Sequence, residues 1–386
     1  MNASPGVQPL IPPQRDLFEL PRDTCYLNAA YMGPMPRKAV AAGQDSYARK
    51  GQPWHYQVQA DFFDAPETLR DRAAHLFGTS ANDLALVPAA SYGLATAARN
   101  LAPDAKSEIL VLAEQFPSNV YVWRELAAEH GARLRTVSRS DSQSWTEAML
   151  AAISTATSIV ACPHVHWADG GALDLAAISD AARRQGAALV LDLTQSLGVM
   201  PFDLSAIQPD FAVAAAYKWL LGPYAMGFLY VAPHHQDGEP LEQNWIVRDK
   251  AEDFARLVDY ADDHAIGARR FDMGERSNFQ LVPAAIASTD AMLDWGADAL
   301  SATLGANNRS LADRLAPLGL RETTPDRAAH YLSLSLPDGA PANLVAELAS
   351  QKIYVSQRGD RMRITPHVYN DEADFDRFVS VLESLL

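Results

Sequence analysis

Cysteine is scarce in this sequence, with only Cys25 and Cys162 among 386 residues. Two cysteines exclude a disulfide framework, and their spacing excludes a Cys-x-x-Cys metal motif. The opening segment, MNASPGVQPLIPPQ, lacks the basic start and apolar centre of a signal peptide and is rich in proline. We therefore expect an extended N-terminal arm over residues 1–21, no bound metal, and a cytoplasmic protein.

Positive charge is also in short supply, because 32 basic residues face 47 acidic ones and the formal net charge is −15. Such a balance repels nucleic acid and anionic lipid, and no cluster of lysine or arginine reverses it locally. The chain also lacks Gly-x-Gly-x-x-Gly and Gly-Lys-Ser/Thr loops, so no motif supports nucleotide binding. We expect a small-molecule ligand and no nucleic-acid partner.

The longest apolar run is FAVAAAYKWLLGPYAMGFLYVAP, residues 211–233, and Lys218 is its only charge. A lysine near the middle of a membrane-spanning helix costs about 2.5–3.5 kcal/mol, and Gly222-Pro223 would break the helix. Two strands joined by a Gly-Pro turn fit the residue types better. The run therefore predicts no membrane span, and it places one lysine at the end of a buried strand.

Strand and helix patterns alternate from residue 68 onward, which predicts an α/β fold. Such alternation indicates a mostly parallel sheet with helices on both faces, which we assign to a large domain over residues 22–275. The remaining residues mix short strands with helices, which predicts a smaller α+β domain over residues 276–386. The predicted helices of the large domain are 68–78, 91–102, 118–131 and 174–186. Its predicted strands are 83–90, 108–114, 157–165, 187–193, 210–216 and 225–232.

Ligands of open parallel sheets bind beyond the carboxyl ends of the strands. Residues that directly follow the apolar runs are therefore the candidates for a site. They are Ser91, Phe116, His164, His166, Asp192 and Lys218.

A carboxylate and a lysine on neighbouring strand ends suit pyridoxal phosphate. The Lys218 amine would condense with the aldehyde of the cofactor, and burial would favour its neutral form. Asp192 would keep the pyridine nitrogen protonated, and Phe116 would stack on the ring. Backbone amides at the start of a helix would hold the phosphate. These amides belong to Ser91, Tyr92 and Gly93.

Two motifs make the chain similar to a known family. Asp-x-x-Gln-Ser-x-Gly starts at Asp192, and Lys-Trp-Leu-x-Gly-Pro starts at Lys218. The surrounding run, LVLDLTQSLGVMPFDLSAIQPDFAVAAAYKWLLGPYAMGFLYV, resembles the core of the class V aminotransferases, which are fold-type I pyridoxal-phosphate enzymes. The likeness extends from CYLNAAYMGPMP near the start of the chain to RMRITPHVYND near its end. The family includes cysteine desulfurases, kynureninases, isopenicillin N epimerase-like proteins and several aminotransferases.

The resemblance implies roles for the residues around the cofactor. It makes Lys218 the lysine that forms the Schiff base and Asp192 the partner of the pyridine nitrogen. It places Gln195 near the 3-hydroxyl group of the cofactor and Tyr217 near its phosphate.

The resemblance also implies a substrate pocket and a partner subunit. Arg363 matches the arginine that binds the substrate α-carboxylate, and Asn28 falls where the N-terminal segment lines the pocket. His166, or its neighbour Trp167, is expected to line the same pocket. The stretch 270–279 matches a loop that reaches the phosphate of the neighbouring subunit, which implies a homodimer with shared active sites.

Some positions depart from the family pattern. Many members have a histidine at the position of Phe116, whereas kynureninases have phenylalanine there, as this chain does. Asn119, however, stands where kynureninases usually have aspartate. Glu275 follows Gly274 where threonine is common. No cysteine follows Cys162, which argues against a desulfurase.

Transamination of an α-amino acid is the expected reaction. A pyridoxal-phosphate lyase, a kynureninase-like hydrolase or an epimerase remain alternatives, because these reactions share their first steps. A relative that binds cofactor or metabolite without turnover is a further alternative.

Simpler structural roles also stay open for single residues. Asp192 would then be a helix N-cap, Phe116 a core residue, and Arg363 a partner in a surface salt bridge. Glu275 and Arg276 would be a solvated pair, and His164 with His166 would suggest a metal.

Overall fold

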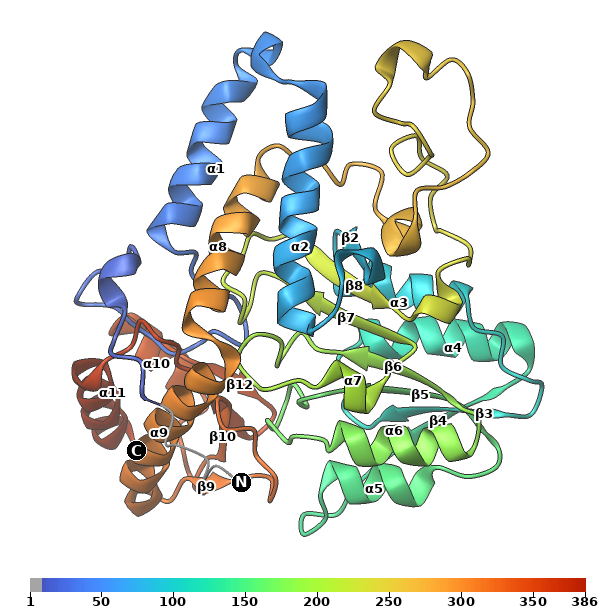
Figure 1. Ribbon diagram of the computed structural model, residues 1–386. Coiled ribbons are helices and arrows are strands. Elements are labelled where there is room, and N and C mark those ends of the chain that lie inside the picture. Colours follow the sequence, from blue (N-terminus) through green and yellow to red (C-terminus); the bar gives the residue numbers. More distant parts are fainter. Residues whose placement is uncertain (1–8) are drawn as a thin grey trace, which may run out of the picture.

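A computed structural model describes residues 9–386 (Figure 1), so the first eight residues of the predicted N-terminal arm lie outside the described part. The largest element is a seven-stranded sheet with strand order β2-β8-β7-β6-β5-β3-β4. Its strands are β2 (Leu84–Val87), β3 (Glu108–Leu112), β4 (Arg133–Val137), β5 (Thr157–Pro163), β6 (Ala188–Asp192), β7 (Phe211–Ala215) and β8 (Gly227–Val231).

Strands β3 to β7 run parallel to one another, whereas β8 is antiparallel to both β2 and β7. A short connection from β7 to β8 permits only an antiparallel pair, because a parallel pair needs a long crossover. The apolar run 211–233 is thus two strands, as the sequence predicts.

Alternate side chains of each strand enter two separate cores. Leu84 and Leu86 of β2 belong to one core, and Ala85 and Val87 to the other. The first core is closed by α2 (Ala65–Phe77), α5 (Trp145–Ala152), α6 (Leu175–Arg184) and α7 (Leu204–Ile207). The second is closed by α3 (Ala90–Arg99) and α4 (Ser118–His130). Helices therefore cover both faces of a mostly parallel sheet, which confirms the predicted fold class.

A smaller antiparallel sheet lies at the C-terminal end, with strand order β12-β13-β10-β9. Its strands are β9 (Arg321–Glu322), β10 (Leu332–Ser335), β12 (Ser356–Arg358) and β13 (Arg361–Ile364). The associated helices are α9 (Ala297–Leu315), α10 (Leu344–Ser350) and α11 (Glu372–Leu385). Their apolar side chains form a third core.

Packing crosses the predicted boundary between the large and the small domain. Strand β1 (Cys25–Tyr26) pairs with β11 (Ile353–Tyr354), so an N-terminal segment joins the C-terminal core. Helix α8 (Leu281–Trp295) packs against α1 (Arg37–Lys50) and α2, as Figure 1 shows. The division at residues 22 and 276 stays a prediction.

Short 3-10 or π turns connect these elements. They are Arg15–Leu17, Pro53–His55, Val58–Asp64, Ala81–Asp83, Pro233–His235, Phe254–Arg256, Gly267–Phe271 and Ala316–Leu318. None of the helices in residues 9–386 combines the length and the apolar composition needed to cross a lipid bilayer.

Candidate active site

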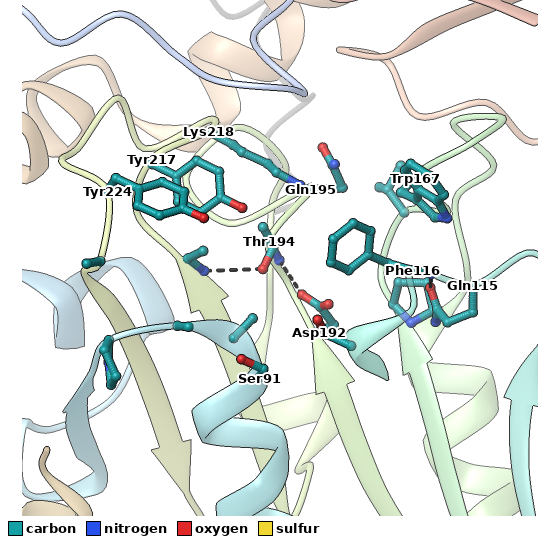
Figure 2. A pocket seen from close by; sticks show the side chains of 18 residues that line it. Ser91, Gln115, Phe116, Trp167, Asp192, Thr194, Gln195, Tyr217, Lys218 and Tyr224 are labelled. Atoms are coloured by element: carbon teal, nitrogen blue, oxygen red, sulfur yellow. Dashed lines mark hydrogen bonds between the residues drawn. The ribbon is translucent and has the colours of Figure 1, made fainter. Parts of the chain in front are cut away.

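A cavity of about 220 Å³ lies beyond the carboxyl ends of the parallel strands. Figure 2 shows its lining side chains, which come from the turns after β2, β3, β5, β6 and β7. Among the predicted site residues, those that line it are Ser91, Phe116, Asp192, Gln195, Tyr217 and Lys218. Residues that are far apart in the sequence therefore meet at the edge of the sheet where ligands bind.

Lys218 projects into this cavity from the turn that follows β7 (Figure 2). The side chain is 8% exposed. Burial lowers its pKa to about 8, opposed by the charge of Asp192 and reinforced by Arg363 and Arg358. A substantial neutral fraction near neutral pH makes this amine a nucleophile and a base.

The turn that carries Lys218 is held by close backbone contacts. The amide of Gly222 donates to the Ala216 carbonyl at 2.8 Å, and the amide of Gly33 donates to the Tyr217 carbonyl at 2.9 Å. A Cβ at Gly33 would lie 2.2 Å from the Lys218 carbonyl oxygen. Only glycine permits this approach of the N-terminal segment.

Asp192 is the last residue of β6 and is 8% exposed. Its Oδ1 accepts the Thr194 amide at 3.0 Å, and Thr194 Oγ1 accepts the Ala215 amide at 3.2 Å. Since a turn and not a helix follows Asp192, the N-cap alternative is wrong. Within residues 9–386 no basic side chain lies within 4.0 Å of this carboxylate. Its negative charge therefore remains available to a ligand.

Phe116 and Trp167 form an aromatic wall of the cavity. Their rings meet edge to face, with centroids 5.3 Å apart and an interplanar angle of 81°. The Lys218 Nζ lies 5.3 Å from the Phe116 centroid. Phe116 is therefore a lining residue and not a core residue.

The phosphate-type helix start differs from the prediction by one residue. Helix α3 begins at Ala90, and the amides of Tyr92 and Gly93 both donate to the Ala89 carbonyl, at 3.1 and 3.3 Å. In the described chain, the amides of Ala90 and Ser91 have no such acceptor. The free donors at the cavity thus belong to Ala90 and Ser91, whereas Tyr92 and Gly93 lie outside its lining.

Gln195 and Tyr217 line the cavity beside the lysine. Gln195 donates its amide to the Ala30 carbonyl at 3.2 Å and accepts from Trp219 Nε1 at 2.8 Å. The Tyr217 ring lies 4.6 Å from that of Tyr224, and burial raises its pKa.

Three predicted substrate residues do not line the cavity itself. Both ring nitrogens of His166 are engaged, by Asp169 and by the Ala113 carbonyl, each at 3.1 Å. Asn28 is buried where the N-terminal segment bridges to Thr365.

Arg363 is the third of these residues. It is 1% exposed and donates to Ser356 Oγ at 2.9 Å, the Trp167 carbonyl at 2.8 Å and Tyr331 Oη at 3.1 Å. Its burial excludes the alternative of a surface salt bridge. Its guanidinium carbon lies 5.6 Å from the centroid of the Trp167 ring, which places it next to the aromatic wall.

Four polar lining residues lie outside the predicted set. They are Gln115, Ser118, Thr194 and Tyr224. Gln115 directly precedes Phe116, and Thr194 lies two positions after Asp192. Both therefore also lie just after the end of an apolar strand, which is the criterion that singled out Phe116 and Asp192. The Gln115 Nε2 is buried without a partner in the described chain.

Several residues of the predicted inter-subunit loop, 270–279, form ion pairs and hydrogen bonds within their own chain. Arg276 pairs with Asp272 at 2.8 Å and is buried, so it is not a solvated pair with Glu275. The Ser277 hydroxyl donates to the Phe62 carbonyl at 2.6 Å, and the Gly274 amide donates to Glu242 at 2.7 Å. A phosphate contact from this loop stays a prediction.

In residues 9–386, the group of side chains that could hold a metal is Asp210, His234 and His235. Both histidines contact the same Asp210 oxygen at 2.9 Å, and none of the three lines the cavity. His164 and His166 belong to no such group. Burial lowers the pKa of His164 to about 4, so it is neutral at pH 7.

Comparisons with known proteins agree with this geometry. The aminotransferase class-V family matches residues 25–378. Isopenicillin N epimerase of Streptomyces clavuligerus is 26% identical over 93% of this chain and 94% of its own. Kynureninase of Deinococcus radiodurans is 30% identical over 78% of this chain and 72% of its own. A solved structure of a C-DES mutant, with glycine covalently linked to its PLP cofactor, has a TM-score of 0.86 at 20% identity and covers 97% of this chain and 100% of its own. The chain therefore belongs to the class-V aminotransferase family of pyridoxal 5′-phosphate enzymes.

Proposed function

We propose that this protein is a pyridoxal 5′-phosphate enzyme that transaminates an α-amino acid. The observation that carries the proposal is the buried Lys218 amine, whose pKa is lowered to about 8 in a cavity that also holds Asp192. A lysine of this kind is suited to a carbonyl cofactor.

The donor set of the cavity fits the cofactor. Lys218 supplies an amine for the aldehyde, Asp192 a carboxylate for the ring nitrogen, and Phe116 an aromatic face. The free amides of Ala90 and Ser91, at a helix N-terminus, suit a phosphate. When bound, the cofactor supplies an electron-withdrawing ring that stabilises negative charge on the substrate α-carbon.

Three side chains would transfer the proton, keep the ring nitrogen protonated and orient the substrate. Neutral Lys218 takes the proton from the substrate α-carbon and returns it. Asp192 keeps the ring nitrogen protonated through its negative charge. Arg363 orients the substrate by its α-carboxylate, for which a planar guanidinium is well suited.

The titratable side chains of the cavity, which could transfer protons, support transamination. The titratable side chains among the described lining residues are those of Asp192, Tyr217, Lys218 and Tyr224. Burial raises the pKa of Tyr217, so it is protonated at neutral pH. Lys218 is thus left as the one amine base, and transamination requires one base that shuttles a single proton. The cavity lining also contains no cysteine, which an enzyme that transfers sulfur through a thiol would need.

Hydrolytic cleavage of the kynureninase type is the second candidate. Phe116 and the 30% identity to a kynureninase favour it. Against it, Asn119 replaces the usual aspartate, and its buried side chain accepts from Trp123 Nε1 at 2.7 Å and lies outside the cavity lining.

Titration of the purified holoenzyme with single amino acids, without a keto acid, separates these functions. We expect the visible absorbance of the cofactor to disappear in proportion to the amino acid consumed and to return when a keto acid is added. Persistent absorbance, together with ammonia or a cleaved side chain among the products, would instead indicate a lyase or hydrolase.

A binding protein without turnover is tested with Lys218→Ala. An enzyme loses its chemistry in this variant, whereas a sensor keeps the affinity for its ligand. Retention of every wild-type response by Lys218→Ala would contradict an enzymatic role.

We also propose that the protein is a cytoplasmic homodimer. Large side chains are exposed near the end of α1, on the α1–α2 connection and on residues 245–266, which project on the same side of the molecule in Figure 1. Exposed apolar patches of this kind mark interfaces. They include Tyr47, Trp54, Val258, Tyr260 and Ile266. Light scattering should give twice the chain mass of 42.0 kDa, and a monomer at micromolar concentration would contradict the proposal.

A further inference from the structure

Two arginines lie side by side next to the aromatic wall. Strands β12 and β13 form a hairpin in which Ser356 faces Arg363 and Arg358 faces Arg361. Because opposite residues share a face of a sheet, and alternate residues do as well, Arg358 and Arg363 project on the same side. Their guanidinium carbons lie 5.3 and 5.6 Å from the centroid of the Trp167 ring. One indole that lines the cavity thus contacts both cations.

Neither arginine is neutralised within residues 9–386. No carboxylate oxygen of the described chain lies within 4.0 Å of Arg358 or Arg363. Arg358 donates to the Gln357 carbonyl at 2.7 Å, and Arg363 donates only to neutral oxygens. By contrast Arg361, on the same hairpin face, pairs with Glu114 at 2.9 Å.

Two adjacent cations without a counterion, Arg363 fully buried and Arg358 partly buried, repel each other. The pKa of Arg358 is lowered by burial and then by the charge of Arg363. Burial is the main cause that lowers the pKa of Lys218, and both arginine charges lower it further. The chain has 47 acidic and 32 basic residues, so carboxylates are abundant. None of those in the described residues forms an ion pair with Arg358 or Arg363.

We infer that Arg358 binds a second anionic group of the substrate, so that the enzyme prefers amino acids whose side chain ends in a carboxylate or a similar oxyanion. The inference rests on the proposed function, in which Arg363 takes the α-carboxylate. Arg358 then faces the side chain, and a substrate with two anionic groups neutralises both guanidinium groups. A planar guanidinium on an aromatic face offers a paired set of donors to such a group.

Succinate and butyrate are matched probes, because both have four carbons and differ by one carboxylate. Neither is a substrate for transamination, so binding is measured without turnover, by calorimetry on the holoenzyme. We expect wild type to bind succinate more tightly than butyrate. Arg358→Gln should weaken succinate binding about tenfold or more and leave butyrate unchanged. Arg361→Gln is the matched control and should change neither affinity.

Arg358→Lys is a second variant, which keeps the charge and can be used if the glutamine variant folds poorly. It should retain part of the preference for succinate. Equal weakening of both ligands in Arg358→Gln would overturn the inference, because Arg358 would then serve the α-carboxylate. No change for either ligand would also overturn it.

Steady-state rates separate this inference from the proposed function. Arg358→Gln should raise KM for aspartate or glutamate and leave KM for alanine unchanged. If wild type transaminates no amino acid but still binds succinate in an Arg358-dependent manner, the proposed function fails and the anion subsite stands.

Discussion

Gly33 lies directly against the backbone of Lys218, with its amide bonded to the Tyr217 carbonyl and no room for a Cβ beside the Lys218 carbonyl. The N-terminal segment therefore forms part of the support of the site. This contact links residues that are far apart in the sequence, and it fixes the turn from which the lysine projects.

Gly33→Ala should displace that turn. A Cβ 2.2 Å from a carbonyl oxygen requires the backbone to move, so we expect weaker cofactor binding and reduced turnover. Gly43→Ala is the control, because the nearest atoms to a Cβ there are 3.8 Å away and the residue lies inside helix α1. This control should stabilise the protein by about 0.5–1 kcal/mol. A Gly33→Ala enzyme with wild-type cofactor affinity would contradict the role of this contact.

Burial of Lys218 predicts how the stability of the cofactor-free protein changes with pH. The folded-state pKa of about 8 lies below the ordinary value of 10.5, so the unfolded chain binds more protons between these values. The free energy of unfolding should therefore rise with pH from 8 to 10.5. Lys218→Met removes the dependence and should stabilise the apo protein at pH 7 by about 3 kcal/mol.

Urea titration of wild type and Lys218→Met across pH 7 to 11 measures this difference. The two proteins should converge in stability above the ordinary lysine pKa. A constant difference between them at every pH would show that Lys218 is not buried as a titrating group.

Asp192→Asn tests the role assigned to the carboxylate. The substitution keeps the shape and removes the charge that favours a protonated ring nitrogen. We expect turnover to fall roughly 10²–10³-fold, a loss typical of one removed electrostatic contact. Cofactor occupancy, read from the visible spectrum, is the control, and full activity at full occupancy would contradict the assignment.

A buried ion pair anchors loop 270–279 to helix α2 through Asp272 and Arg70. Arg70 and Asp272 are both fully buried, bonded through two contacts of 2.9 and 2.7 Å, and Asp272 also accepts the Leu86 amide at 2.7 Å. Asp272→Ala removes the bidentate partner of buried Arg70, whose remaining carboxylate contact is with Glu67 at 3.1 Å. The substitution should destabilise the protein by about 3–5 kcal/mol.

Asp290→Ala provides the comparison, because Asp290 pairs with Arg72 at 2.8 Å where both side chains are more than one third exposed. It should change the free energy of unfolding by about 1 kcal/mol or less. Similar losses in both variants would contradict the assigned importance of burial.

Much of the large domain could be predicted from the sequence because most of its parallel strands are short apolar runs that alternate with amphipathic helices. Strand β4, RLRTV, was not predicted, because it lies at the edge of the sheet and its arginines are partly exposed. Gly296, at φ 75°, divides the long stretch after residue 280 into α8 and α9.

The position of the site was also predictable, because it depends only on where strands end. Finer features depend on single residues and on contacts between distant segments. Helix α3 starts after Ala89, which has no side chain that caps a helix, so the sequence does not reveal which amides are free. The engagement of His166 by Asp169 and the pairing of Arg358 with Trp167 arise only in the folded chain.

Covalent trapping tests the central claim most directly. The holoenzyme is reduced with borohydride and digested, and the modified peptide is identified by mass spectrometry. The chain has six lysines, at positions 38, 50, 106, 218, 250 and 352. We predict that the cofactor is attached to Lys218 alone. Attachment to another lysine, or no attachment after incubation with pyridoxal 5′-phosphate, would contradict the assignment of the site.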